Sequence, residues 1–387
     1  METQPFYRDT WAEVNLDHIT SNVESLRKIL PEDVKIFAVV KANAYGHGDI
    51  QVARAALSAG VHYLAVATLD EAVRLRQKGI DKKVPILVIG ATRPSDVVLA
   101  ADLDVTLTVF QLEWLKQANE LLTEGRTIRV HMKIDTGMGR IGVKTTQEIK
   151  EMEGYIKDHS AFYLEGTFTH FASADSLDRT YYEKQLSTFK TLVESFEERP
   201  EIVHCSNSAA SLRYPESYCN AVRFGISMYG LTPSLEIQAE LPFQLKEALS
   251  LKTKLTHVKQ IQKGEKIGYG STYVASDAEW IGTLPIGYAD GWIRRLQGQE
   301  VLVEGKRTPI VGRICMDQTT VKLSSSLPIG TEVTLIGEQG SEFISVNEIA
   351  NKLETINYEV ICMVSNSVPR VYIQGGEIVE IFNGLIS

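Results

Sequence analysis

The stretch Val34-Lys35-Ile36-Phe37-Ala38-Val39-Val40-Lys41-Ala42-Asn43-Ala44-Tyr45-Gly46-His47-Gly48 is the best guide to the fold of this chain. Its first seven residues form a short, β-branched, apolar run between polar turns, which predicts a buried strand. Lys41 follows directly and so lies at the carboxyl end of that strand, where α/β folds bind ligands. An amine held there among small residues is a candidate Schiff-base lysine, although a solvated lysine that caps a strand fits the same local pattern.

Strand-like apolar runs alternate with amphipathic helical runs from Val34 to about Arg223. We expect strands at residues 34–40, 62–67, 85–89, 104–108, 127–134, 163–169, 201–205 and 219–223. Helical spacing of apolar residues fills most of the gaps, as in 69–76 and in the long segment 178–199. Eight strand–helix repeats predict a parallel (β/α)8 barrel, with an open doubly wound sheet as the alternative.

The pattern changes after about Leu241, where period-2 alternation and glycine-containing turns predict a mainly β domain. Strands are expected at residues 249–261, 280–286, 301–303, 309–314, 331–336, 358–364 and 378–382, and a single clear helix at 346–352. We therefore predict a barrel domain over residues 1–243 and a β domain over 244–387. The short strand near residues 10–15 is a candidate to join the β domain.

The composition is typical of a globular enzyme that acts on a small molecule. The chain has 387 residues, 44% of them hydrophobic and 23% charged, and its formal net charge of −9 argues against binding to nucleic acid or anionic membranes. Its four cysteines lack CxxC spacing, so neither a zinc site nor a disulfide framework is predicted. Residues 1–13 lack a secretion signal and no window approaches about 20 uninterrupted apolar residues, so we expect a cytoplasmic protein that does not span a membrane.

The barrel prediction brings polar side chains from separate strands to one mouth, because the carboxyl ends of parallel strands share one face. The residues expected there are Lys41, Lys133, Arg140, His170, Asn207, Ser208 and Arg223. This concentration of positive charge in an acidic protein predicts an anionic ligand. Taken singly, His170 also fits a core histidine, Lys133 a partner of Asp135, and Ser208 a helix cap.

A phosphate site is predicted at the same mouth. Asn207 and Ser208 open a helix, and Gly225 and Ile226 follow Arg223 where backbone N–H groups can approach an anion. A phosphate there and an amine at the first strand predict pyridoxal 5′-phosphate. If Arg223 faces the pyridine nitrogen, the ring stays largely neutral because the guanidinium keeps its proton, and this favours α-proton exchange over transamination.

Four motifs resemble the signatures of the alanine racemases, and the resemblance covers essentially the whole chain. They lie at residues 38–48 (AVVKANAYGHG), 131–142 (HMKIDTGMGRIG), 286–291 (IGYADG) and 312–318 (GRICMDQ). We see no departure at a position that the family uses. The resemblance implies a homodimeric, pyridoxal-phosphate-dependent isomerase that interconverts L-alanine and D-alanine and supplies D-alanine for peptidoglycan.

The resemblance also implies roles for individual residues. Lys41 would hold the cofactor and act as the base on the D-alanine side, and Tyr269, supplied by the partner subunit's β domain, would act on L-alanine. Lys133 resembles a carbamylated lysine that orients Arg140. Further residues are implied around the phosphate and cofactor (Tyr45, Leu87, His170, Asn207, Ser208, Arg223, Gly225, Ile226 and Tyr358), around the substrate (Arg140, Met316, Tyr288 and Asp317) and at the entrance (Asp175, Arg294, Arg313 and Ile356).

Three alternatives remain at the level of the sequence. A serine racemase or a racemase of broader specificity would share the fold, but the bulk of Tyr358 favours alanine. A barrel-type pyridoxal decarboxylase would place a carboxylate where Arg223 stands. A non-catalytic pyridoxal-phosphate carrier would have no use for Tyr269 or for the residues after Leu241.

Overall fold

A computed structural model of the chain describes residues 6–123 and 125–386; the first five residues of the amino-terminal segment considered above lie outside this range. The chain divides into two compact units. One contains Ile19–Ala44 and Asp49–Lys246, and the other contains the residues up to His18, Tyr45–Gly48 and the residues from Glu247 onward. Each unit is described separately below.

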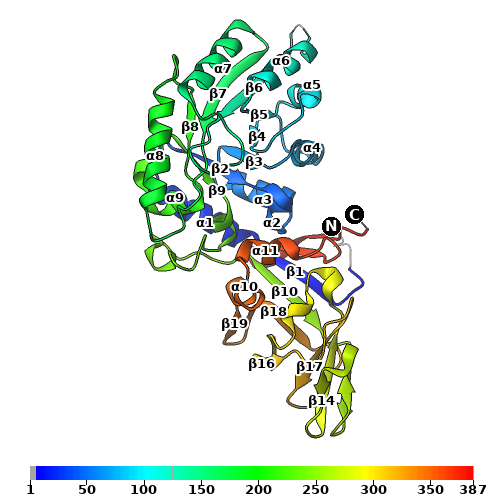
Figure 1. Cartoon of the computed structure of the whole chain (residues 1–387). Coiled ribbons are helices and arrows are strands. Elements are labelled where there is room, and N and C mark those ends of the chain that lie inside the picture. The colour runs from blue at the N-terminus through cyan, green and yellow to red at the C-terminus, as the bar shows by residue number, and fades with distance from the viewer. Residues whose placement is uncertain (1–5, 124, 387) are drawn as a thin grey trace. The chain divides into compact units, whose positions relative to one another are not determined.

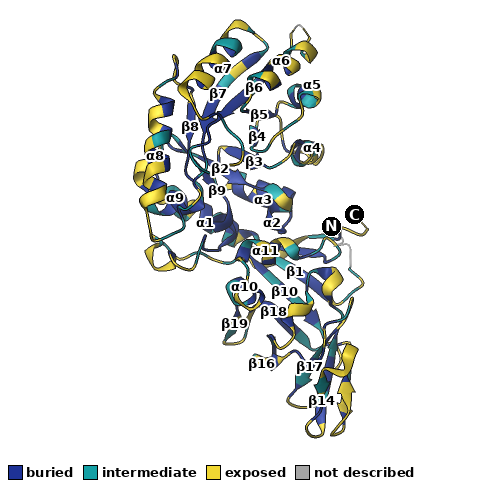
Figure 2. Cartoon of the chain, in the orientation of Figure 1, coloured by how far each residue is buried: buried dark blue, intermediate teal, exposed yellow. Residues whose placement is uncertain are grey.

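The first unit is a closed barrel of parallel strands, which confirms the predicted fold. Each strand pairs with the next in sequence, and β9 pairs with β2 to close the barrel (Figure 1). The strands are β2 (Lys35–Val39), β3 (Tyr63–Val66), β4 (Ile86–Val88), β5 (Thr106–Val109), β6 (Ile128–Lys133), β7 (Phe162–Phe168), β8 (Ile202–His204) and β9 (Ala221–Phe224). They are mostly buried, as the dark blue ribbons in Figure 2 show, because helices cover the outside of the barrel.

The helices between the strands are amphipathic, and two of them begin with reciprocal capping. Thr68 and Glu71 form a capping box at α4, and Thr145 and Glu148 form one at α7. The α-helices of this unit are α1 (Leu16–Ile29, whose first three residues belong to the other unit), α3 (Asp49–Ser58), α4 (Leu69–Gln77), α5 (Val97–Asp102), α6 (Leu112–Leu121), α7 (Thr146–Asp158), α8 (Thr180–Val193) and α9 (Ser208–Arg213). Short 3-10 turns are η1 (Pro94–Asp96), η2 (Pro215–Ser217), η3 (Ile226–Tyr229) and η4 (Gln238–Glu240).

The second unit is mainly β, as predicted. Its largest sheet has the strand order β16-β15-β18-β10-β1-β20-β21, with β19 paired to β18; separate small sheets are formed by β11-β14-β17 and by β12-β13. The strands are β1 (Thr10–Asn15), β10 (Leu249–Lys254), β11 (His257–Ile261), β12 (Lys266–Ile267), β13 (Tyr273–Val274), β14 (Glu279–Leu284), β15 (Glu300–Val303), β16 (Lys306–Pro309), β17 (Thr319–Leu323), β18 (Glu332–Gln339), β19 (Glu342–Ile344), β20 (Arg370–Gln374) and β21 (Glu377–Phe382).

One predicted strand of this unit is wrong. Residues 358–364 belong to a second helix, α11 (Asn357–Met363), which follows α10 (Val346–Leu353). Its buried residues Asn357, Val360 and Ile361 recur at helical spacing. A short apolar run of this length cannot be assigned to strand or helix from periodicity alone.

Further details of the second unit differ from the prediction. The strand expected at 309–314 overlaps β16 only at Pro309, and Gly312 has a φ of 69°, a left-handed conformation that interrupts an extended strand. The strand expected at 249–261 is divided into β10 and β11, and the strands β12, β13, β17, β19 and β20 were not predicted. The remaining 3-10 turns are η5 (Tyr269–Ser271), η6 (Tyr288–Asp290) and η7 (Arg294–Leu296). Among the described residues, no helix is long and apolar enough to cross a membrane.

Candidate active site

Lys41 begins a left-handed turn at the carboxyl end of the first barrel strand. The turn is assigned as α2 (Lys41–Tyr45), but Ala42, Asn43, Ala44 and Tyr45 all have φ between 51° and 54°. Left-handed backbone costs about 1–2 kcal/mol for each residue with a β-carbon. Such strain persists only where surrounding structure enforces it, and it is concentrated at functional sites.

Hydrogen bonds to neighbouring segments of the barrel unit hold this turn in place. The Ala42 N–H donates to Glu71 Oε1 over 2.6 Å, and Asn43 Oδ1 accepts from the Asp49 N–H over 3.1 Å. Glu71 also caps the helix that follows the second barrel strand. The position of Lys41 is therefore fixed by contacts that do not involve its amine.

Positive charge converges on Lys133, the last residue of β6. Its side chain is buried, and burial followed by the charges of Arg223, Arg140 and Lys41 lowers its pKa to about 8. Asp135 is not within ion-pair distance of it; Asp135 Oδ1 instead accepts from the N–H groups of Gly137 and Gly139 at 3.1 and 3.0 Å. The predicted cluster of cations at one mouth is present, and it has an excess of positive charge.

Arg223 is a buried cation whose donors go to neutral acceptors. Its guanidinium donates to the carbonyl oxygens of Thr169 (2.8 Å), Cys205 (3.0 Å) and His204 (3.2 Å), and to His170 Nδ1 (3.3 Å). Desolvation lowers the pKa of Arg223 to about 10, so it remains charged at neutral pH. Desolvation and the Arg223 charge hold the pKa of His170 well below its usual value, so this imidazole is neutral.

A buried chain of hydrogen bonds links Arg223 to a carboxylate inside the barrel. Arg223 Nη1 lies 2.9 Å from His204 Nδ1, His204 Nε2 lies 3.0 Å from His131 Nδ1, and His131 Nε2 lies 3.1 Å from Glu165 Oε2. The guanidinium can only donate, so each imidazole accepts at Nδ1 and donates at Nε2. Desolvation lowers the pKa of both histidines, and hydrogen bonds from His131 and Thr106 lower that of Glu165 despite its burial.

These four residues form a directional chain from a cation to an anion, and only Arg223 among them was predicted as a site residue. A usable signal was present, because side chains two residues apart in a strand point to the same face. His131 shares a face with Lys133, and Glu165 shares one with Thr167. Polar residues at alternate positions of neighbouring barrel strands therefore marked the interior of the barrel.

The predicted phosphate-binding segments lie side by side. Asn207 caps α9 by accepting from the Ala210 N–H over 3.1 Å, so Ser208 is not the cap. Ser208 Oγ instead accepts from the Gly225 N–H over 2.9 Å. Ile226 begins the η3 turn, and the first N–H groups of a helical turn lack partners within the turn. A hydroxyl and backbone N–H groups suited to an anion are thus adjacent.

The other predicted residues of the barrel have clear positions. Leu87 is fully buried in β4, and Arg140 is exposed on the loop after β6. Asp175 lies on the loop after β7, where burial raises the pKa of its carboxyl and its backbone carbonyl accepts from the Ser234 hydroxyl.

Tyr269 stands on a tight turn of the β unit. It lies in η5, between β12 and β13, and 69% of its surface is exposed. Gly268 and Gly270 on either side have φ of 71° and 73°, and a β-carbon on Gly270 would lie 2.9 Å from the Arg313 guanidinium. The turn thus requires glycine at these two positions. In the single chain, the Tyr269 phenol is exposed to solvent.

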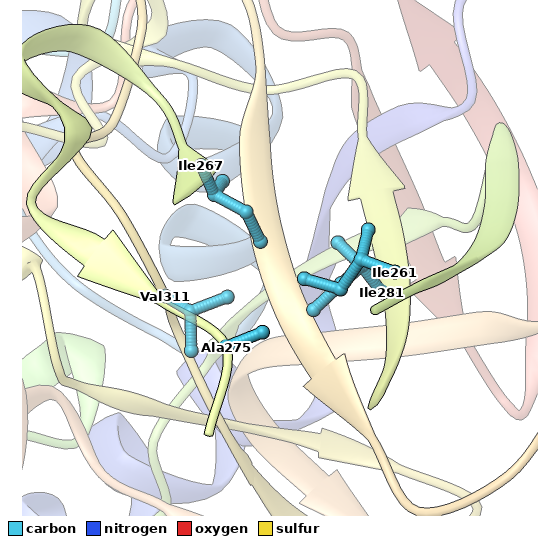
Figure 3. Close-up of a cluster of buried hydrophobic side chains, with 5 residues drawn as sticks. All are labelled: Ile261, Ile267, Ala275, Ile281 and Val311. Carbon is cyan, nitrogen blue, oxygen red and sulfur yellow. The ribbon is translucent and has the colours of Figure 1, made fainter. Parts of the chain in front are cut away.

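A small apolar cluster anchors the strands on either side of this turn. Its members are Ile261, Ile267, Ala275, Ile281 and Val311 (Figure 3). Tyr273 packs against them. Ile267 is the last residue of β12, two positions before Tyr269, and Ala275 follows β13. The base of the hairpin is therefore fixed even though its tip is exposed.

Backbone hydrogen bonds connect the loops that carry Tyr288 and Met316. The Tyr288 and Ala289 N–H groups each donate over 3.0 Å, to the carbonyls of Cys315 and Met316. The predicted substrate and entrance residues of this unit are all exposed to solvent. They are Tyr288, Arg294, Arg313, Met316, Asp317 and Ile356.

Tyr358 lies in the first turn of α11, with its ring centroid 6.1 Å from that of Tyr45. Tyr45 is buried and follows the left-handed turn that begins at Lys41. The strand predicted at 358–364 was wrong, and the helix found there places Tyr358 beside Tyr45 within the same unit.

Comparisons with known proteins agree with this geometry. The family model "Alanine racemase, N-terminal domain" matches residues 14–233, and "Alanine racemase, C-terminal domain" matches residues 248–372. The alanine racemase of Geobacillus stearothermophilus is 56% identical over 98% of this chain and 97% of its own length.

Solved structures show the same similarity. An alanine racemase from Bacillus anthracis with bound L-Ala-P has a TM-score of 0.95 and 51% identity, and the match covers 98% of this chain and 99% of that one. A histidine racemase from Leuconostoc mesenteroides has a TM-score of 0.90 and 31% identity, and the match covers 96% of this chain and 100% of that one.

Proposed function

The chain belongs to the alanine racemase family and is a racemase, an isomerase; from this premise we propose that it interconverts L-alanine and D-alanine with pyridoxal 5′-phosphate held on Lys41. The observation that carries the proposal is the position of Lys41, fixed in a strained turn at a barrel mouth crowded with cations. Such a mouth suits a ligand with a phosphate and a carboxylate.

The residues of this mouth fit that cofactor. Ser208 would offer its hydroxyl proton and Ile226 its backbone N–H to a phosphate, and the Gly225 N–H, which donates to Ser208 Oγ, would orient that hydroxyl. Tyr45 and Tyr358 would complete the assembled site. Arg223, which keeps its proton, is proposed to donate to the ring nitrogen. When bound, the cofactor withdraws electrons from the amino acid's α-carbon and makes its proton acidic.

Two bases of this protein are proposed to move that proton. The Lys41 amine would exchange it on the D-alanine side and the Tyr269 phenol on the L-alanine side, while Arg140 and Met316 hold the substrate carboxylate and Asp317 lies beside them. Tyr269 is exposed within its own chain, so we propose that it acts in the active site of a partner subunit in a homodimer. The exposed Ile356 and Met316 support such an interface, because large apolar side chains favour burial.

Lys133 is proposed to carry a carbamate. A pKa of about 8 leaves about a quarter of the amine uncharged at pH 7.5, and this is the form that reacts with carbon dioxide. Carbamylation would replace a cation by an anion among Arg223, Arg140 and Lys41, and so would orient Arg140.

The entrance residues Asp175, Tyr288, Arg294, Arg313 and Ile356 are proposed to restrict the side chain of the substrate.

The test is to incubate the purified protein with L-alanine in deuterated water. Optical rotation and the incorporation of deuterium at the α-carbon are measured together. We expect deuterium uptake to accompany loss of rotation. Uptake with full retention of rotation would refute the two-base assignment, and release of carbon dioxide would indicate a decarboxylase instead. Absence of any reaction would support the carrier alternative.

A racemase of broader specificity is the second candidate, because a histidine racemase has the same fold at 31% identity. The bulk of Tyr358 beside Tyr45 favours the small side chain of alanine. Parallel assays with L-serine and L-histidine distinguish the two: turnover of either at a rate comparable to that of L-alanine would favour the broader enzyme.

A further inference from the structure

Two cysteines lie in contact at the back of the Arg223 site. Cys205 follows β8 and is fully buried, and Cys219 lies in the turn before β9; their Sγ atoms are 3.8 Å apart. We propose that Cys205 and Cys219 form a peroxide-sensitive thiol pair that closes a reversible disulfide behind Arg223. Neither thiol takes part in the racemase chemistry proposed above.

The environments of the two thiols assign different roles to them. Cys219 is partly exposed and lines a surface cavity together with Lys190 and Arg199, so a small oxidant can reach it. The contact with Cys205 and then the charges of Arg199 and Lys190 lower the pKa of Cys219, whereas burial raises the pKa of Cys205. Because the thiolate is the nucleophile, Cys219 is the residue that reacts first.

The oxidation proceeds in two balanced steps with hydrogen peroxide as the oxidant. The Cys219 thiolate attacks one peroxide oxygen, the O–O bond breaks, and a sulfenic acid and hydroxide result. The Cys205 sulfur then attacks the sulfenic sulfur and forms the S–S bond. The sulfenic hydroxyl leaves, and the thiol proton of Cys205 converts one of the two hydroxides to water. The two sulfurs are oxidised by two electrons in total, and the peroxide is reduced.

The disulfide would pull on groups that hold the candidate active site. The sulfurs must approach from 3.8 Å to about 2.05 Å. Cys205 donates its S–H to the Ser217 carbonyl over 3.0 Å, a bond that the disulfide removes. The backbone carbonyl of Cys205 accepts from Arg223 over 3.0 Å. Movement of Cys205 therefore displaces an acceptor of Arg223, and this effect on activity rests on the proposed function.

The test uses the full-length holoenzyme, exposed to hydrogen peroxide, alkylated and digested with trypsin. Cleavage after Arg213 separates the fragment 191–213, which contains Cys205, from 214–223, which contains Cys219. We expect a linked pair of these fragments, 2 Da lighter than their sum, which a phosphine reductant separates. Racemase activity should fall in proportion to the linked fraction and return on reduction.

Variants separate the pair from other effects of peroxide. Cys219→Ser should abolish the linked fragments and retain activity under peroxide, whereas the control Cys362→Ser, at an exposed cysteine elsewhere, should behave as the wild type. The absence of linked fragments from oxidised wild-type protein would overturn the proposal. Linked fragments with unchanged activity would overturn the coupling to Arg223. The mass measurement requires no racemase activity, so failure of the proposed function is recognised separately.

Discussion

The buried histidines of the Arg223 chain predict a loss of stability in mild acid. His131 and His204 are fully buried and their pKa values are lowered on folding, so below about pH 6.5 the unfolded chain binds protons that the folded chain does not. The two histidines therefore do not lower the free energy of unfolding above that pH, and they lower it progressively as the pH falls below it. A histidine that has an ordinary pKa in the unfolded chain and binds no proton in the folded chain shifts the unfolding equilibrium by at most about tenfold between pH 7.5 and 5.5, and the pair by at most about a hundredfold.

Urea unfolding at the two pH values measures this loss, and a variant assigns it. His131→Gln keeps a donor toward Glu165 and an acceptor toward His204 but does not titrate, so the difference between the two pH values should shrink, by at most about tenfold in the unfolding equilibrium constant. The difference is read within each variant, so a general destabilisation does not obscure it. His257→Gln, at an exposed histidine, should leave the difference unchanged. An unchanged difference in His131→Gln would show that His131 is not held neutral by burial.

Three further predictions concern residues of the β unit. Tyr269→Phe removes the proposed base and should slow α-deuterium exchange from L-alanine by about 10²–10⁴-fold. The visible absorbance of the bound cofactor should not change. A fully active variant would contradict the role proposed for Tyr269. Tyr358→Ala should raise the rate with L-serine relative to L-alanine by about tenfold, because it would widen the proposed site beside Tyr45. An unchanged ratio in competition assays would exclude Tyr358 as a determinant of specificity. Ile281→Ala, in the cluster under the Tyr269 hairpin, should lower the free energy of unfolding by about 2–5 kcal/mol. The control Val379→Ala, at an exposed position, should lower it little. Equal denaturation midpoints of the two variants would show that the cluster does not anchor the β unit.

The barrel was predictable because its strands are short apolar runs whose spacing does not depend on distant contacts. The cations at its mouth followed from that topology, since strand ends place Lys133 and Arg223 on one face. Tyr358–Val364 was predicted wrongly because its composition is compatible with strand and helix, and packing of Val360 and Ile361 decided for helix.

The left-handed turn after Lys41 could not have been predicted. Nothing in Ala42-Asn43-Ala44 excludes ordinary helix or loop, and the preferences of two alanines oppose the conformation observed. The carboxylate of Glu71, almost thirty residues further along, accepts from the Ala42 N–H and holds the turn. Tertiary contacts of this kind override local preference.

The place of β1 has a consequence for biosynthesis. Thr10–Asn15 lies between β10 and β20, and the latter begins only at Arg370. The 354 residues between Asn15 and Arg370 take roughly 20–70 s to synthesise at about 5–20 residues per second. The first strand to leave the ribosome thus completes its pairing only when β20 has been synthesised, so deletion of Thr10–Asn15 would disturb the unit that carries Tyr269 rather than the barrel that follows it in sequence.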